Sequence, residues 1–106
     1  GWANNVQIVG NYAYVAHWES GLQIIDISNP TSPTLKGNYD TPAAIDVQIV
    51  GNYAYVADEY SGLQIIDISN PAAPTLVGTY DTPGSAHSVQ IVGNCAYVAD
   101  CGSGLQ

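Results

Sequence analysis

Two histidines, two cysteines and nine acidic residues are the side chains of this 106-residue chain that could perform chemistry. Neither His17 nor His87 has beside it the serine or cysteine motif that a base-activated nucleophile needs. Zinc would need a second His or a Cys at ligand spacing, and neither histidine has one, apart from the distant Cys101. Asp58 and Glu59 could offer oxygens to calcium, but the alternating D-x-D-x-D-G loop is absent. We therefore expect no enzyme and no cofactor, with calcium as the metal alternative.

The two cysteines are too few to form a disulfide scaffold. Cys95 begins an apolar run and Cys101 follows just past its end. Six extended residues span about 20 Å, whereas bridged Cα atoms lie within about 7 Å of each other. Unless the loop folds back, we expect a free thiol or an intermolecular bridge, neither of them catalytic.

The chain is built from an internal repeat. The block VQIVGNYAYVA at residues 6–16 returns letter for letter at 47–57, and at 89–99 with Cys95 replacing a tyrosine. A second block, SGLQIIDISNP at residues 20–30, returns at 61–71 and begins again at residue 103. The period is 41 residues and then 42. A fixed period of this size, filled with short apolar runs, is typical of a repeat architecture.

Each repeat divides into four strand-like runs, which in the first copy are residues 6–9, 12–16, 22–28 and 34–39. A Gly-Asn turn separates the first two runs, and a proline breaks the chain after the third. No window carries an apolar stripe of helical period with caps. Four short antiparallel strands per repeat are typical of a propeller blade. We expect an all-β fold of propeller blades.

The polarity of the runs predicts their order within a blade. The first three runs have apolar residues at successive positions, such as Ile24-Ile25, which suits sheets buried on both faces. The fourth run is more polar and carries Lys36, as an outer edge strand does. The first run is therefore expected innermost and the fourth outermost. A β-solenoid, which prefers shorter coils, and a sandwich, which has no reason to repeat letter for letter, are the alternatives.

The units GNYAYVA, GLQIIDISNP and PTLxGxYDTP resemble the LVIVD-repeat family of β-propellers, which occur in bacterial and archaeal cell-surface and secreted proteins. The resemblance covers nearly the whole chain, with the three blocks in order and at the family's spacing. It implies a propeller scaffold that is extracellular or at the cell surface. It implies no activity, because the family has no common catalytic motif.

The blade repeats are predicted at residues 6–42 and 47–83, with an incomplete one at 89–106, as a single partial propeller. A closed ring needs at least about four blades. We therefore expect a fragment, natural or engineered, of a longer propeller. Its exposed blade faces and strand edges should associate with other copies, so that a homo-oligomer completes the propeller.

Most residues that differ between repeats fall in two connections, between the second and third runs and from the fourth run to the next repeat. A four-stranded meander places both at one end of a propeller, which we call the variable rim. Binding residues tend to lie on loops of a rigid scaffold, although loops also drift when packing does not constrain them. The candidate ligand-binding residues are Trp2, His17, Trp18, Glu19, Asp58, Glu59, Tyr60 and His87. Seven acids are expected on this rim: Glu19, Asp40, Asp46, Asp58, Glu59, Asp81 and Asp100.

Two other recurring residue types have structural interpretations. Asp26 and Asp67 precede the Ile-Ser-Asn-Pro turn, where an aspartate accepts hydrogen bonds from turn N–H groups. The tyrosines of the second run recur too regularly for a site, and we expect them to pack between blades. They are Tyr12, Tyr14, Tyr53, Tyr55 and Tyr97.

Charge and hydropathy exclude two classes of partner. The net charge is −8 with a single cationic residue, which disfavours nucleic acid because phosphate binding needs clustered Lys and Arg. No apolar run approaches the roughly 18 residues of a membrane span.

We predict a non-enzymatic module that acts as a binding, adhesion or structural scaffold for a protein or glycan. The alternative is a lectin-like, calcium-assisted carbohydrate binder that stacks sugars on Trp2, Trp18 and Tyr60.

Overall fold

The computed structural model describes residues 3–82, 85–101 and 104–105, which form strands and turns without a helix. The first sheet holds β1 (Ala3–Val9), β2 (Tyr12–His17), β3 (Gly21–Asp26) and β4 (Thr34–Tyr39). The second holds β5 (Ala44–Val50), β6 (Tyr53–Asp58), β7 (Gly62–Asp67) and β8 (Thr75–Tyr80). The third holds β9 (Ser85–Val92), β10 (Cys95–Cys101) and β11 (Gly104–Leu105).

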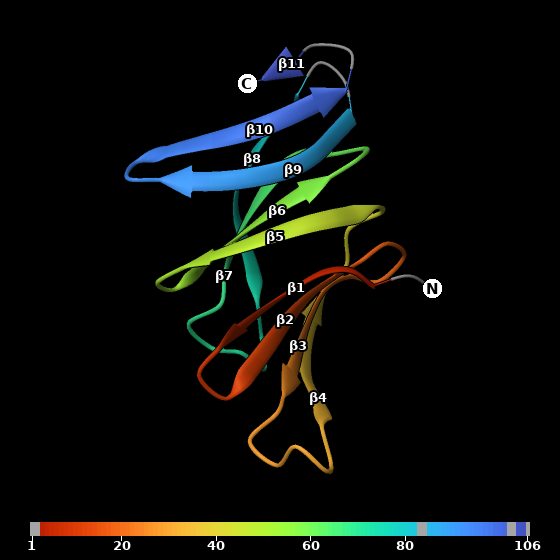
Figure 1. Cartoon of the computed structure of the whole chain (residues 1–106), viewed down its shortest axis with the longest axis vertical. Coiled ribbons are helices and arrows are strands. Elements are labelled where there is room, and N and C mark those ends of the chain that lie inside the picture. The colour runs from red at the N-terminus through yellow and green to blue at the C-terminus, as the bar shows by residue number, and fades with distance from the viewer. Residues whose placement is uncertain (1–2, 83–84, 102–103, 106) are drawn as a thin grey trace.

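Every sheet is an antiparallel meander in which strands pair with their neighbours in sequence. The first strands β1, β5 and β9 pack side by side along the molecule, and β4 and β8 lie at the outer edges (Figure 1). This confirms the all-β prediction and the strand order, and it is consistent with propeller blades. The Gly-Asn turns are also confirmed, because Gly10, Gly51 and Gly93 have φ of 61°, 59° and 58°.

The first strand of each repeat begins earlier than predicted. Residues 43–46 were expected to form a connection, but β5 already begins at Ala44 and β1 begins at Ala3. A bulge interrupts the pairing of each first strand, between Ala3 and Asn5 and between Ala44 and Asp46. The bulge shifts the strand register by one residue, so the segment before it does not continue the pattern of the apolar run that follows. The third run also ends earlier than expected, at Asp26, and Cys101 ends β10 instead of following it.

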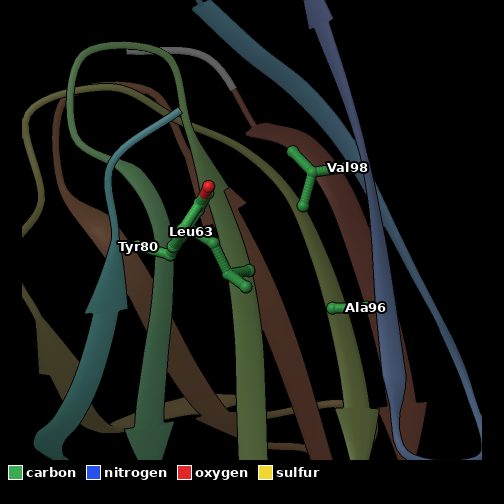
Figure 2. A pocket seen from close by; sticks show the side chains of 4 residues that line it. All are labelled: Leu63, Tyr80, Ala96 and Val98. Atoms are coloured by element: carbon green, nitrogen blue, oxygen red, sulfur yellow. The ribbon is translucent and has the colours of Figure 1, made fainter. Parts of the chain in front are cut away.

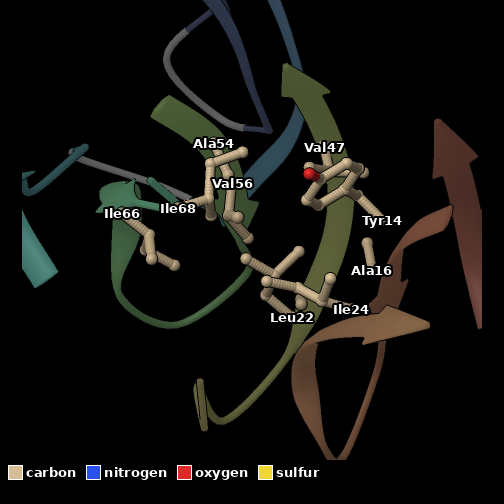
Figure 3. Packing of buried hydrophobic residues seen from close by; sticks show 10 residues of the cluster. Tyr14, Ala16, Leu22, Ile24, Val47, Ala54, Val56, Ile66 and Ile68 are labelled. Carbon is tan, nitrogen blue, oxygen red and sulfur yellow. The ribbon is translucent and has the colours of Figure 1, made fainter. Parts of the chain in front are cut away.

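Two apolar clusters join the three sheets. The first lies between the first and second sheets, where Leu22, Ile24 and Val56 meet in its middle (Figure 3). The second lies between the second and third sheets and includes Leu63 and Val98. The second sheet is therefore buried on both faces, as its successive apolar positions predict.

The tyrosines of the second strands pack as predicted in three of five positions. Tyr14 is buried in the first cluster, and burial raises the pKa of its hydroxyl. Tyr12 and Tyr55 pack partly against the clusters. Tyr53 and Tyr97 are 42% and 44% exposed, which does not fit the packing prediction. For Tyr97 the reason is its place on the far face of the third sheet, which no described strand covers.

Candidate functional site

The loops between the second and third strands lie beside the starts of the first strands, as the variable rim requires. The N–H of Glu59 donates to the carbonyl of Ala43 at 2.9 Å, so the β6–β7 loop is joined to the connection that enters β5. The Gly-Asn turns lie at the other end of the strands (Figure 1). In the second repeat, the two connections that make up the rim therefore lie together at one end of the sheet.

Two predicted aromatic residues of the rim contact each other across the first and second sheets. Trp18 and Tyr60 have ring centroids 5.9 Å apart and planes inclined at 72°, an edge-to-face arrangement. Trp18 is half-buried, whereas Tyr60 is 70% exposed. The pair presents a large aromatic surface to solvent.

A second pair crosses from the second sheet to the third. His87 Nε2 lies 3.7 Å from Glu59 Oε2, with side chains that are 46% and 22% exposed. The contact is an ion pair only when the imidazole is protonated, and its exposure makes it weak. Four of the predicted site residues therefore form two contacts, one at each junction between sheets.

Asp58 has a structural use that the sequence interpretation did not foresee. Its side chain is fully buried. One carboxylate oxygen accepts the N–H of Ala43 at 3.0 Å, and the other accepts those of Tyr60 and Ser61 at 2.9 Å each. A carboxylate used in this way is not open to a ligand, which corrects its assignment to the binding surface and removes it as a calcium ligand.

His17 and Glu19 are the remaining candidates that the structure describes. His17 takes the place of Asp58 in the first repeat, where its ring is half-buried and its Nδ1 has no hydrogen-bond partner among the described residues. Glu19 is exposed. Trp2 lies outside the described residues. Within the part of the chain that the structure describes, no three His, Cys, Asp or Glu side chains gather as metal ligands would.

Burial and hydrogen bonding also reduce the number of carboxylates that the rim presents to solvent. Asp46 is half-buried with its carboxylate bonded to backbone, like that of Asp58. The side chain of Asp100 lies outside those described. The predicted rim acids that stand at or near the surface are Glu19, Asp40, Glu59 and Asp81.

Comparison with known protein families agrees with the repeat pattern. The family model of the LVIVD repeat matches at residues 1–41, 43–82 and 83–106. The chain belongs to the LVIVD-repeat family. No significant match was found among curated proteins or among solved structures.

The first strands of the LVIVD repeats are joined by polar contacts that sequence reasoning missed. Asp46 accepts the N–H of Val89 in the third repeat at 3.0 Å and also binds the side-chain amide of Asn5 in the first. The side-chain oxygen of Gln7 accepts the N–H of Ile49 at 2.6 Å. The available signal was weak: a polar residue precedes each VQIV block.

The predicted aspartate turns are confirmed in the first two LVIVD repeats. Asp26 Oδ1 accepts the hydroxyl of Ser28 at 2.7 Å and its N–H at 2.9 Å, and these bonds lower the pKa of Asp26. Asp67 accepts the N–H of Ser69 at 2.8 Å, which lowers the pKa of Asp67 in the same way. These carboxylates stabilise turns and are not part of the rim.

A cavity of about 270 Å³ lies between the second and third repeats. Leu63 and Tyr80 line one side of it, and Ala96 and Val98 line the other (Figure 2). Its lining is apolar apart from the tyrosine hydroxyl, so it offers no acid–base or metal chemistry.

Among the described residues there is no helix of the length and hydropathy that a membrane span requires.

Proposed function

We propose that this LVIVD-repeat chain is a non-enzymatic binding and adhesion scaffold whose variable rim contacts a ligand outside the cytoplasm. The observation that carries the proposal is the Trp18–Tyr60 contact, which places an exposed tyrosine ring at the junction of two sheets. Aromatic side chains combine a large apolar area with a polar tip and are frequent anchors at interfaces. The family resemblance supports the extracellular location.

The rim has the rigidity that a binding surface needs. Asp58 holds the β6–β7 loop by accepting the N–H groups of Tyr60 and Ser61, so the tyrosine backbone is fixed. The loop is also tied to the entering connection through Ala43. Pre-organised contacts reduce the entropy lost on binding.

A direct test is adhesion of the fluorescently labelled chain to bacterial cells and to matrix-coated surfaces. Tyr60→Ala and Trp18→Ala should each reduce retention at least about tenfold, because removal of an interface anchor costs roughly 2 kcal/mol. Tyr53→Ala is the matched control, since Tyr53 is also an exposed tyrosine but lies beside a Gly-Asn turn. Equal retention by all four proteins would contradict the proposal.

A lectin-like function is the second candidate, and the same aromatic pair favours it, because sugar rings stack on exposed aromatic faces. The burial of Asp58 argues for binding without calcium, since both of its oxygens already accept backbone N–H groups. A glycan array with and without calcium separates the possibilities. Calcium-independent signals that disappear in Tyr60→Ala would support the lectin, and an array without signals would reject it.

We further propose that copies of the chain associate face to face and thereby complete a propeller. Val6 and Ile8 are 52% and 59% exposed on the first sheet, whereas Val47, in the same position of the second repeat, is 3% exposed because the first sheet covers it. At the other end, Tyr97 is exposed on the face that matches buried Tyr14. Unlike faces at two ends permit head-to-tail association, which closes into rings when the geometry allows.

Light scattering tests the association. We expect a mass above that of the 11.1 kDa chain at micromolar concentration, and Ile8→Asp should reduce it because a charge would enter the contact. Val50→Asp, at an exposed position next to a turn, is the control. A well-folded monomer in the unsubstituted chain would refute the proposal.

A further inference from the structure

The aromatic pair of the variable rim has a shape that suits a cation. The ring planes of Trp18 and Tyr60 are inclined at 72°, with centroids 5.9 Å apart, so the rings form two adjoining walls of a corner. Trp18 is half-buried and Tyr60 is 70% exposed, so the corner opens to solvent beside the tyrosine. The face of an aromatic ring is its negative side, and it attracts a cation that lies within about 6 Å.

Exposed carboxylates border both of the loops that carry these rings. Each loop ends at a glycine that packs against the residue after the fourth strand of the same sheet. A Cβ added to Gly21 would lie 3.0 Å from the carbonyl carbon of Asp40. A Cβ added to Gly62 would lie 3.1 Å from the Cα of Asp81. Both aspartates are exposed, so each aromatic loop has an acid beside it at the surface.

The chain has little positive charge with which to balance these acids. Lys36 is the single lysine or arginine of the sequence. Hydrogen bonds from Ser28 are the main cause that lowers the pKa of Asp26, and the charge of Lys36 contributes, so Lys36 lies toward the end of β3 that is farther from the rim. On the rim, Glu59 lies 3.7 Å from His87 Nε2, which is charged only when the imidazole is protonated. A cationic ligand would therefore be attracted to the rim.

We propose that the corner between Trp18 and Tyr60 binds an arginine side chain of a partner peptide, with the neighbouring carboxylates as counter-charges. The proposal names a ligand class for the binding function proposed above and rests on it. A guanidinium group is planar, so it can stack on a ring while its N–H groups donate to a carboxylate. The ammonium group of lysine has no such plane, and an uncharged sugar would gain nothing from the acidic border.

The test is an NMR titration of the isotope-labelled 106-residue chain with the blocked peptide Gly-Ser-Arg-Ser-Gly. The matched peptide carries citrulline, an uncharged isostere, in place of arginine. We expect saturable shift changes at the indole N–H of Trp18 and the amide of Tyr60, with a dissociation constant of about 1 mM at low salt. The citrulline peptide should bind at least about fivefold more weakly, because it loses the attraction to the ring and to the carboxylates. Salt at about 0.3 M should weaken the arginine peptide at least about twofold.

Substitutions in the chain locate the site independently. Tyr60→Leu keeps an apolar side chain but removes the aromatic face, and it should weaken binding of the arginine peptide at least about fivefold. Tyr53→Leu, at an exposed tyrosine beside a Gly-Asn turn, is the matched control and should leave binding unchanged. The double variant Glu59→Gln with Asp81→Asn should weaken binding at least about twofold and reduce its dependence on salt.

The peptide comparison uses the unsubstituted chain, so it decides even if a variant does not fold. Equal binding of the arginine and citrulline peptides, no binding up to about 10 mM, or equal losses in Tyr60→Leu and Tyr53→Leu would overturn the proposal. The adhesion assay with Tyr60→Ala is run in parallel. Adhesion that depends on Tyr60, without binding of the arginine peptide, would reject arginine as the ligand and leave the binding scaffold standing. Peptide binding without adhesion would support the arginine site and reject adhesion.

Discussion

The carboxylate of Asp46, in the second repeat, accepts a hydrogen bond at 3.0 Å from the backbone N–H of Val89, in the third. Its other oxygen accepts the N–H of Val47 at 2.9 Å and contacts the side-chain amide of Asn5 in the first repeat. One side chain at a bulge thus connects three sheets whose backbone ladders are separate. The innermost strands are joined by polar contacts as well as by apolar packing.

Asp46→Ala should lower the free energy of unfolding by about 2 kcal/mol, because it leaves partly buried N–H groups without an acceptor. Urea denaturation measures this change. Asp40→Ala is the matched control: Asp40 is exposed and accepts a hydrogen bond from the side-chain amide of its near neighbour Asn38, so the change should stay within about 0.5 kcal/mol. Similar losses in both variants would show that Asp46 does not join the sheets.

Most of the fold was predictable because the repeat shows the same local signals several times. The run Thr34–Tyr39 coincides with β4, and the turn at Asp26 forms as its spacing indicates. The contacts of Asp46 were not predictable, because their partners lie in neighbouring repeats and are largely backbone groups that leave no mark on the sequence. The start of each first strand was also missed, because a bulge can form at any residue type and the sequence therefore does not mark it.

The candidate rim was predictable as a place but not in its detailed contacts. Variation between repeats located the loops that hold Trp18 and Tyr60, yet it could not show that the two rings touch. Asp58 looked like a surface acid because it stands at a variable position. Its burial follows from backbone N–H donors such as that of Ala43, which composition cannot show.

Asp58→Ala should cost about 3 kcal/mol of unfolding free energy, since three backbone N–H groups lose a charged acceptor. Asp81→Ala, at an exposed acid, should change the free energy of unfolding by less than about 0.5 kcal/mol.

The opposite substitution can be made at His17, which occupies the position of Asp58 in the first repeat. His17→Asp should stabilise the first repeat by about 1 kcal/mol, because it replaces a ring nitrogen that has no partner among the described residues with an acceptor for loop N–H groups. Chemical denaturation of the three variants distinguishes these outcomes, and a destabilised His17→Asp would contradict the equivalence.

Acid should destabilise the protein through the aspartate turns. The pKa of Asp26 and of Asp67 is lower in the folded state than the ordinary value of 3.8, so folding there favours the ionised form. Their contribution is present above pH 3.8 and is lost as the pH falls through the folded pKa values. The double variant Asp26→Asn with Asp67→Asn should therefore show a shallower fall in urea midpoint between about pH 5 and pH 2. An unchanged slope would mean that other carboxyls control acid unfolding.

The Trp18–Tyr60 contact should stabilise the first junction beyond the area that each ring buries. A double-mutant cycle of Trp18→Ala and Tyr60→Ala should give a coupling energy of about 1 kcal/mol, as edge-to-face pairs do. The same cycle with Tyr53 in place of Tyr60 should give none, because Tyr53 lies at the other end of β6. A coupling near zero for both pairs would show that the rings lie side by side without mutual stabilisation.

Gly37 and Gly78 occupy the same position in the first and second repeats, yet their surroundings differ. A Cβ at Gly37 would clash with the carbonyl oxygen of Pro71, in the turn that follows β7, so β4 packs directly on the backbone of the second repeat. A Cβ at Gly78 would meet nothing closer than Ile65 Cδ1 at 3.7 Å, an ordinary contact.

Gly37→Ala should therefore lower the free energy of unfolding by about 2 kcal/mol, because one of the two backbones must move and the first junction must open. Gly78→Ala should leave it unchanged or raise it by roughly 0.5 kcal/mol, since alanine restricts the unfolded chain. Thermal and urea unfolding of the pair measure the difference at one repeat position with one chemical change. If both substitutions were equally costly, glycine would be needed by the strand itself, and the close approach of the repeats would not be the cause.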